Sequence, residues 1–344
     1  MLNPAANGEC AAAIGNAANF GKLGAATRVN PSVLSGWGVR PHDNNLTASV
    51  QQQILPNVAG EFSYTHRAFH GFFVTDDLNR NVNTDYESYT LTAPQDPRLP
   101  GGGGYPITVL VPTVQVPAQT FLTKETDFGP ERKSTWDGFD VTFNARIRQG
   151  VRAQIGTSTG RGFVDTCATV TKFNNVNGSQ EAGPDPRGCH NVEPWRTTLR
   201  GLASYTIPKV DVLVSATLRS EPSVARAANW QVPNSVIAAA LGHLRRGTLA
   251  NARTTMPITD NEHRLFADDR QTQIDMRFAK ILRFGRTRAN IGIDLYNLLN
   301  ENYGTAFNST YLFGLDDTPR PSGFGTPTQI TSPRFVRLNF TFDF

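Results

Sequence analysis

A period-two alternation of apolar and polar residues recurs along this 344-residue chain and constrains its fold more than any other feature. It is clearest in the last stretch, RFVRLNFTFDF, where one face of an extended strand carries Val336, Leu338, Phe340, Phe342 and Phe344. Alternate side chains of a β-strand point to opposite faces, so this stretch predicts a strand with one apolar and one polar face.

The same alternation predicts nine strands, at about residues 46–54, 60–70, 137–148, 151–158, 198–207, 210–219, 273–278, 288–296 and 334–344. Four of the connections are short and rich in Pro, Gly and Asn, as tight hairpins require. The other four are long, at about residues 72–135, 161–195, 222–270 and 300–332. Because short and long connections alternate, an antiparallel meander would collect all short turns at one edge and all long loops at the other.

Some secondary structure is also expected inside the long connections. Residues 86–92 and 105–112 are candidates for extra strands, although Pro106 and Pro112 argue against a central position in a sheet. Residues 234–242 are a candidate for a short helical turn.

Composition agrees with a β-rich chain and excludes some functions. Aromatic residues make up 10% of the chain, and 30 Gly and 22 Pro residues indicate many turns. The net charge of +4 is small and the basic residues are scattered, so we expect no nucleic-acid partner. No run of 18 apolar residues predicts a transmembrane helix, but the short alternating strands of a membrane barrel escape such a search.

Two kinds of protein share this alternation. A soluble β-sandwich turns its apolar faces inward, whereas a membrane β-barrel turns them outward to lipid. The strict separation of short turns from long loops favours the barrel. The terminal strand does so too, because it is long enough to span a bilayer. We therefore predict an all-β fold, the C-terminal part of an antiparallel transmembrane β-barrel with about 9–11 strands.

In this interpretation, polar side chains of the predicted strands face the lumen. The charged candidates are Arg146, Arg200, Asp275, Arg277, Arg288, Asp294 and Arg337.

Cysteine and metal-ligand patterns are sparse. Cys167 and Cys189 bracket a polar stretch and would form a disulfide in an exported protein, whereas Cys10 has no evident partner. The acidic pairs 76–77, 268–269 and 316–317 are interpreted as solvated loop charge in preference to calcium ligands. The six histidines lack metal-ligand spacing, and no nucleophile-elbow motif is present. We expect neither a cofactor, nor a metal, nor enzyme activity.

Two segments point to a known family. Residues 281–311, with the motif DLYNLLN, and the finish SPRFVRLNFTFDF resemble the C-terminal end of TonB-dependent outer-membrane receptors. The similarity is greatest to the acidobacterial type that has an N-terminal carboxypeptidase-regulatory-like domain. Residues 44–73 and 199–223 look like paired barrel strands of the same proteins.

This resemblance implies a function in the outer membrane of a Gram-negative bacterium. Family members are 22-stranded barrels that take up scarce nutrients such as iron chelates, cobalamin or oligosaccharides, energised by TonB through a plug domain. No plug is evident here, so the sequence is interpreted as a fragment, with residues 1–44 leading into the barrel and 45–344 forming its C-terminal half. Phe340, Phe342 and Phe344 match the family's signal to the barrel-assembly machinery. The alternatives are a small self-contained outer-membrane pore or adhesin, and a secreted β-sandwich that binds glycans or proteins.

Overall fold

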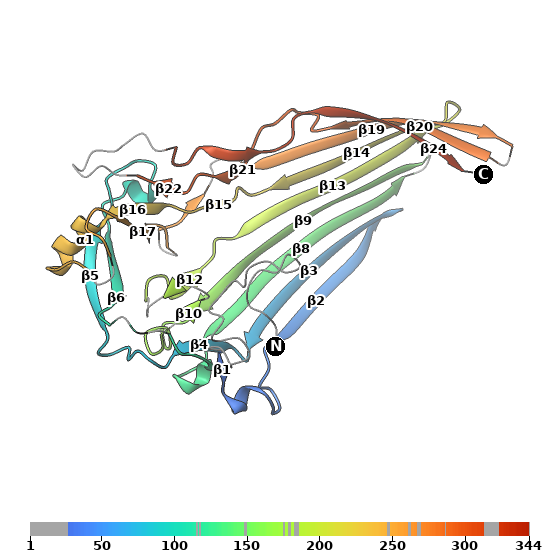
Figure 1. The fold of residues 1–344 in the computed structure, drawn as a ribbon. Helices are drawn as coiled ribbons and strands as arrows, with labels where there is room; N and C mark the ends of the chain where they lie inside the picture. The colour runs from blue at the N-terminus through green and yellow to red at the C-terminus, as the bar shows by residue number, and fades with distance from the viewer. Residues whose placement is uncertain are drawn as a thin grey trace, which may run out of the picture.

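One long antiparallel sheet forms most of the molecule (Figure 1). The computed structural model describes residues 27–344 except 115, 117, 148–149, 175, 178–179, 182–185, 246–247, 261–262, 267–269, 286, 313–322 and 344. The strands of the sheet, in spatial order, are β2 (His42–Leu55), β3 (Val58–His70), β8 (Lys133–Ile147), β9 (Val151–Asp165), β13 (Arg196–Ile207), β14 (Val212–Glu221), β19 (Gln271–Phe284), β20 (Thr287–Tyr296) and β24 (Phe335–Asp343), with β12 (His190–Val192) also paired to β9. Spatial order follows chain order, so the sheet is a meander.

The sheet curves but does not close. Within the described residues, β2 pairs only with β3 and β24 pairs only with β20, which leaves both as edge strands. Both edge strands run from the long-loop end toward the short-turn end. The reason is that neighbouring strands are antiparallel and an odd number of strands lies between β2 and β24.

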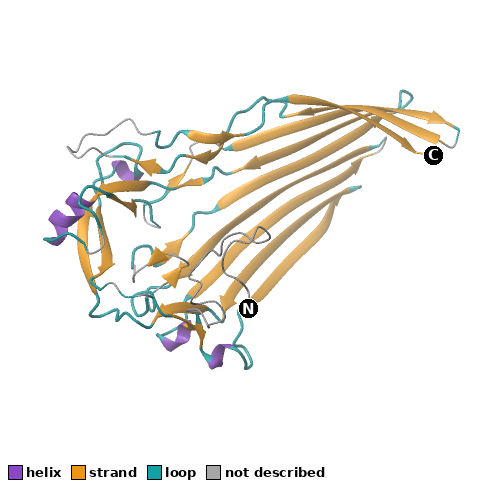
Figure 2. Cartoon of the chain, in the orientation of Figure 1, coloured by secondary structure: helices purple, strands orange, loops and turns teal. Residues whose placement is uncertain are grey.

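Short turns join the strands at one end of the sheet, and helices occur only at the other end within the described chain (Figure 2). The β2–β3 turn places Asn57 at a φ of 65°, and the β8–β9 and β19–β20 turns contain Gly150 at 83° and Gly285 at 60°. Asn and Gly are the residues that adopt this left-handed region most readily. The turn residues are therefore compatible with tight antiparallel hairpins.

The long loops and the segment before β2 contain small elements of their own. They are strands β1 (Arg28–Val29), β4 (Phe73–Asp77), β5 (Tyr86–Thr92), β6 (Pro106–Pro112), β7 (Thr120–Lys124), β10 (Val176–Asn177), β11 (Gln180–Glu181), β15 (Ala225–Arg226), β16 (Asn229–Pro233), β17 (Arg253–Pro257), β18 (Leu265–Phe266), β21 (Gly304–Phe307), β22 (Thr310–Tyr311) and β23 (Pro327–Ile330), helix α1 (Asn234–Leu241), and the 3-10 turns η2 (Pro31–Val33), η3 (Pro100–Gly102) and η4 (Glu125–Asp127). These elements form small separate sheets, such as the β5–β6 hairpin and the group β17–β16–β22.

A tryptophan covers two glycines where β8 and β9 lie side by side. A Cβ atom on Gly138 would lie 2.0 Å from the Trp136 ring, and one on Gly160 would lie 2.4 Å from it. Only glycine leaves room for the indole at these two positions. The ring in turn supplies packing that the side-chain-free glycines lack.

The observed fold confirms the all-β antiparallel prediction. The nine predicted strands are the nine strands on the main path of the sheet, and all four long connections lie at one end. Segments 86–92 and 105–112 form a hairpin outside the main sheet, and 234–241 is helical. The first strand of the sheet begins at His42, slightly before the predicted boundary at residue 45.

Candidate functional site

The strand register assigns all of the predicted lumen residues to one face of the sheet. Arg277 pairs with Asp294, which pairs with Arg337, and Asp275 lies on the same face two residues from Arg277. The cross-strand pairs of β8, β9, β13 and β14 and those of β19 and β20 extend this face to Arg146, Arg200 and Arg288. We call it the polar face, although Leu202, Leu213 and Ile281 also lie on it.

Asp294 is the centre of an ion-pair network on the polar face. Its side chain is 6% exposed, and it accepts hydrogen bonds from Arg337 Nη2 at 2.9 Å and from Asn339 Nδ2 at 2.9 Å. Arg277 Nε lies 3.7 Å from the same carboxylate, and Arg277 Nη2 donates to Asn339 Oδ1 at 2.9 Å. The network joins β19, β20 and β24. It gives the buried Asp294 carboxylate the partners that a charge removed from water requires.

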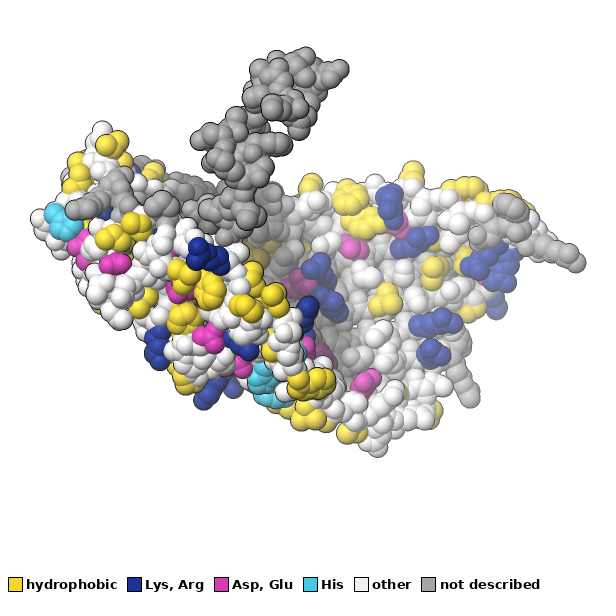
Figure 3. All heavy atoms as spheres, turned by 60° about the horizontal axis from the view of Figure 1, so that its bottom comes forward, with side chains coloured by type: hydrophobic (Ala, Val, Ile, Leu, Met, Phe, Trp, Pro, Cys, Tyr) yellow, Lys and Arg dark blue, Asp and Glu magenta, His cyan; other side chains and the backbone are white. Residues whose placement is uncertain are grey.

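Two hollows lie against the polar face. One, of about 440 Å³, is lined by polar side chains that include Asp140, Thr142 and Arg200. The other, of about 660 Å³, lies nearer the short turns and is lined by Gln51, Arg146 and Arg152 among others. In Figure 3, basic and acidic side chains gather around the hollowed part of the molecule. The polar face is therefore hollowed and carries both polar and charged side chains.

The opposite face of the sheet is apolar, and nothing in the described chain covers it. Val50 is 66% exposed, Phe62 49%, Leu338 76% and Phe340 65%. Phe342 lies on this apolar face as well, whereas Phe344 is outside the described residues. A water-soluble sheet would bury such a face against another layer.

Polar side chains mark the limit of the apolar face on the long-loop side. Within β3, β8 and β9 the register aligns His66, Asp137 and Arg161 in one row. Asp137 Oδ1 accepts hydrogen bonds from the Tyr64 hydroxyl at 2.7 Å and lies 2.8 Å from His66 Nδ1. The Arg161 guanidinium lies 4.8 Å from the centre of the Trp195 ring. Aromatic residues beside charged ones are typical of a membrane–water interface.

The apolar face is somewhat shorter than the apolar band of outer-membrane barrels. On β8 it runs from Phe139 to Ile147 without a charged residue. At about 3.3 Å per residue and a tilt of about 40°, this gives about 20 Å along the membrane normal, near the ~25 Å band of outer-membrane barrels. Between the His66–Asp137–Arg161 row and the short turns, Lys280 is the charged residue on this face of the described strands, and its ammonium reaches the Val210 carbonyl. A lysine near a membrane boundary can extend its head group in this way.

At the long-loop end, three of the loops pack together into a unit that we call the cap. Its core contains Leu91 and Ile107 from the β5–β6 region, Trp230 and Ile258 from the third long loop, and Tyr311 from the fourth. Helix α1 packs against β5 and β16. The cap is thus folded like a small soluble domain, with apolar side chains inside.

A buried carboxylate links the first and fourth long loops inside the cap. Asp96 has a 5% exposed side chain and receives Arg98 Nη2 at 2.7 Å and the Tyr311 hydroxyl at 2.8 Å. Hydrogen bonding from Arg98 lowers the pKa of Asp96 to about 2. Burial, and then the bond to Asp96, raises the pKa of Tyr311. The carboxylate therefore fixes Tyr311 in position as long as it is ionised.

The base of the first long loop is held by a second set of buried charges. Asp77 and Arg80 form an ion pair with side chains that are 0% and 2% exposed, and Asp76 accepts a bond from the Asn174 backbone at 2.7 Å. Glu125 binds Arg132 at 2.5 Å. The interpretation of residues 76–77 as solvated loop charge is therefore wrong, because both carboxylates hold neighbouring segments together. The pairs 268–269 and 316–317 lie outside the described residues.

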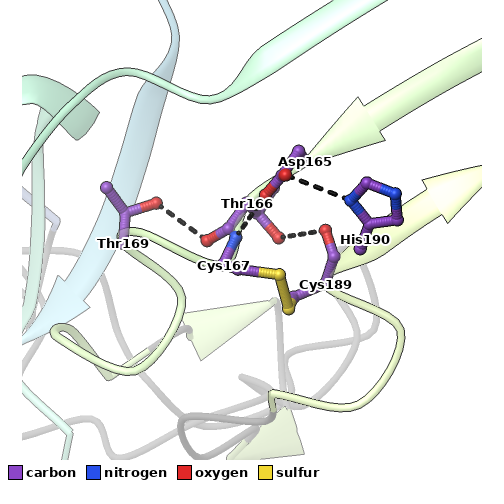
Figure 4. The surroundings of a disulfide bond; sticks show 6 residues. All are labelled: Asp165, Thr166, Cys167, Thr169, Cys189 and His190. Carbon is purple, nitrogen blue, oxygen red and sulfur yellow. Dashed lines mark hydrogen bonds and ion pairs between the residues drawn. A yellow bond between two sulfur atoms is a disulfide. The ribbon is translucent and has the colours of Figure 1, made fainter.

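Cys167 and Cys189 are joined by a disulfide, with Cα atoms 4.9 Å apart (Figure 4). Asp165 next to it accepts a bond from the Cys167 backbone at 3.0 Å and lies 3.1 Å from His190 Nδ1. These contacts, the first of which dominates, lower the pKa of Asp165. The disulfide fixes the second long loop to the end of β9, where β12 adds its short pairing. Cys10 lies outside the described residues.

Sequence reasoning missed the cap residues. Asp96, Arg98 and Tyr311 come from two loops that are far apart in the chain, and Trp230 comes from a third. No local spacing joins these positions. The only available signal was the presence of extended apolar runs such as residues 105–112 inside a predicted loop.

Within the described residues, no helix is long and apolar enough to cross a membrane. No family model matches the sequence, and no curated protein matches it. Among solved structures, the chain is similar to the outer membrane transporter YddB from Escherichia coli, with a TM-score of 0.42 and 12% sequence identity. The match covers 87% of this chain and 32% of that transporter, so the chain spans about a third of its length.

Proposed function

We propose that this chain forms a wall and the outer loops of an outer-membrane transporter of the TonB-dependent receptor class. The observation that carries the proposal is the inverted sheet, which has an exposed apolar face and a charged, hollowed opposite face. The apolar face is suited to contact with lipid hydrocarbon, and the polar face is suited to a water-filled lumen. The alternative from another class is a soluble β-sandwich, but within the described residues no second layer covers Phe62 or Phe340.

Strand length supports a spanning role. The nine strands of the main path contain between 9 and 15 residues each, and a tilted strand needs about 9–11 residues to cross a bilayer. With short turns on the periplasmic side, the cap and the disulfide-linked loop face the outside. The cap would then help to capture a nutrient, and the polar face would line its passage.

The open edges favour a larger barrel over a small self-contained pore. In lipid every backbone N–H and C=O requires a partner, so β2 and β24 must both be paired. They run in the same direction, and direct closure would create a parallel seam in an otherwise antiparallel sheet. Further strands between them, in odd number, would complete an antiparallel wall. In the class proposed here, those strands accompany a plug that contacts TonB.

The test is the location and assembly of the chain in a Gram-negative host. We expect it in the outer-membrane fraction together with the strands that pair its two edges, with electrophoretic mobility that changes on heating because a folded barrel resists detergent. Removal of Phe344 should lower the assembled fraction if the terminal residue is read by the assembly machinery. A chain that stays monomeric and dispersed in detergent-free buffer would contradict the proposal.

A further inference from the structure

A cavity of about 400 Å³ lies where the second and third long loops meet the start of β13. Its wall includes Asn191 and Glu193 from the chain just after the disulfide and Arg196 at the start of β13. Arg226 and Arg264 come from the third long loop. Because Arg196 lies on the polar face, the cavity borders this face at the long-loop end of the sheet.

Contacts with the surrounding chain hold the three arginines in place. Arg196 Nη2 donates to the Ser223 carbonyl, and its guanidinium lies 5.6 Å from the Phe266 ring centre. Arg226 Nη2 donates to the Phe266 carbonyl at 2.7 Å, and Arg264 donates to Asn191 Oδ1. Fixed guanidinium groups lose little side-chain entropy when they bind a ligand, so the cavity is preorganised.

Among the described residues of the cavity wall, positive charge exceeds negative charge. Glu193 and Asp260 are the carboxylates in the lining, against three guanidinium groups. Glu193 Oε2 accepts from the Gly162 backbone at 3.3 Å, and Asp260 Oδ1 accepts from the His263 backbone at 2.7 Å. Each carboxylate is thus already a partner of backbone N–H groups. Guanidinium forks match the geometry of carboxylate and phosphate oxygens.

The aromatic ring adds a second recognition element. Phe266 lies in the same wall, beside Leu265 and within cation–π distance of Arg196. A ligand that occupies this cavity can place an anionic group on the arginines and an apolar or planar part against the ring.

We propose that this cavity binds an organic anion whose carboxylate or phosphate group lies next to a planar or apolar part. The inference rests on the proposed function, because it assigns a substrate class to the capture of a nutrient at the outer mouth. The disulfide supports the site by fixing the segment that contains Asn191 and Glu193.

Titration calorimetry on the complete, membrane-assembled chain in detergent tests this proposal. The probes are phthalate, which combines a ring with two carboxylates, its uncharged analogue phthalamide, and inorganic phosphate. We expect Arg264→Gln to weaken phthalate binding by about ten- to hundred-fold, the value of one charge-assisted hydrogen bond. Arg253→Gln removes the same charge from the same loop outside the cavity and is the matched control; it should change binding less than about two-fold.

A second variant separates charge from contact with the ring. Phe266→Ala keeps the backbone carbonyl that Arg226 uses, so we expect weaker phthalate binding with phosphate binding unchanged. Should Arg264→Gln misfold, Arg264→Lys, which keeps the charge but loses the fork, gives the same comparison.

Three results would overturn the proposal. They are absent binding of both anions, equal phthalate binding by wild type and Arg264→Gln, and equal binding of phthalate and phthalamide. Heat-dependent gel mobility of the same samples reports the membrane assignment independently. Anion binding by a chain that never assembles in a membrane would contradict only the proposed function.

Discussion

The sheet and the cap of this protein place their apolar side chains differently: the sheet exposes them on one face, and the cap buries them in a core. The sheet exposes Phe62 and Phe340 on its apolar face and carries Asp294 and Arg337 on its polar face. The cap encloses Trp230 and Ile258 in a buried core. The two parts of one polypeptide thus differ in where their apolar side chains lie, as expected if they contact different solvents. The cap has the arrangement that suits water, and in the proposed function the sheet has the arrangement that suits lipid.

The largest expected effect is on the cap alone. Trp230 is 6% exposed at its centre, and Trp230→Ala should destabilise local cap folding by about 3–5 kcal/mol through lost burial and a residual cavity. Limited proteolysis should then cleave the third long loop much faster. Leu249→Ala, at a 70% exposed position of the same loop, is the control and should change little. If the cap folds independently of the sheet, the heat-dependent electrophoretic mobility persists in both variants. Loss of this mobility in Trp230→Ala would contradict the independence of the two parts.

Neighbouring residues on β8 test the sheet. Val141 lies on the apolar face and Thr142 on the polar face. Arginine near the bilayer midplane costs about 2–4 kcal/mol on a lipid-facing side and much less in a lumen. We therefore expect Val141→Arg to reduce the membrane-assembled fraction and Thr142→Arg to leave it near wild type. The reverse ranking would mean that the two faces have been assigned to the wrong solvents.

The contrast also explains what the sequence could predict. Alternation at residues such as 137–147 determines which side chains share a face, so strand number, order and the polar face were predictable. The alternation alone did not give the direction in which each face points, because β-sandwiches and barrels have the same period. The barrel was favoured by the separation of short turns from long loops and by the length of the terminal strand. The cap was out of reach, since Asp96 and Tyr311 are 215 residues apart and meet only through folding of the loops. Asp76 was misjudged for the same reason, since the Asn174 backbone that donates to it is 98 residues away, whereas the buried Asp77 pairs with the nearby Arg80.

The disulfide tests whether the second long loop is anchored independently of the cap. The two cysteines are 22 residues apart. In the chain-entropy account, a disulfide that closes such a loop adds about 3 kcal/mol to the free energy of unfolding. Replacing Cys167 and Cys189 together with Ser should therefore expose residues 166–190 to protease while β5 and β6 remain protected. Mass spectrometry after alkylation, with and without reduction, checks that the pair is oxidised in the wild type. Two alkylated thiols at these positions in unreduced protein would contradict the bond.

The smallest effect concerns the charge inside the cap and has a defined pH range. The pKa of Asp96 falls from 3.8 to about 2 on folding, so its ionised form stabilises the cap above pH 4, and this stabilisation is lost as the pH falls from about 4 to about 2. A shift of this size corresponds to about 2 kcal/mol, since one pKa unit equals about 1.4 kcal/mol. Trp230 fluorescence, followed through an acid titration, should report loosening of the cap over that range. In Asp96→Asn the group no longer titrates, so the cap should be weaker at neutral pH and its acid transition in this window should shrink. An identical acid transition in wild type and variant would show that other carboxylates, and not Asp96, hold the first and fourth loops together.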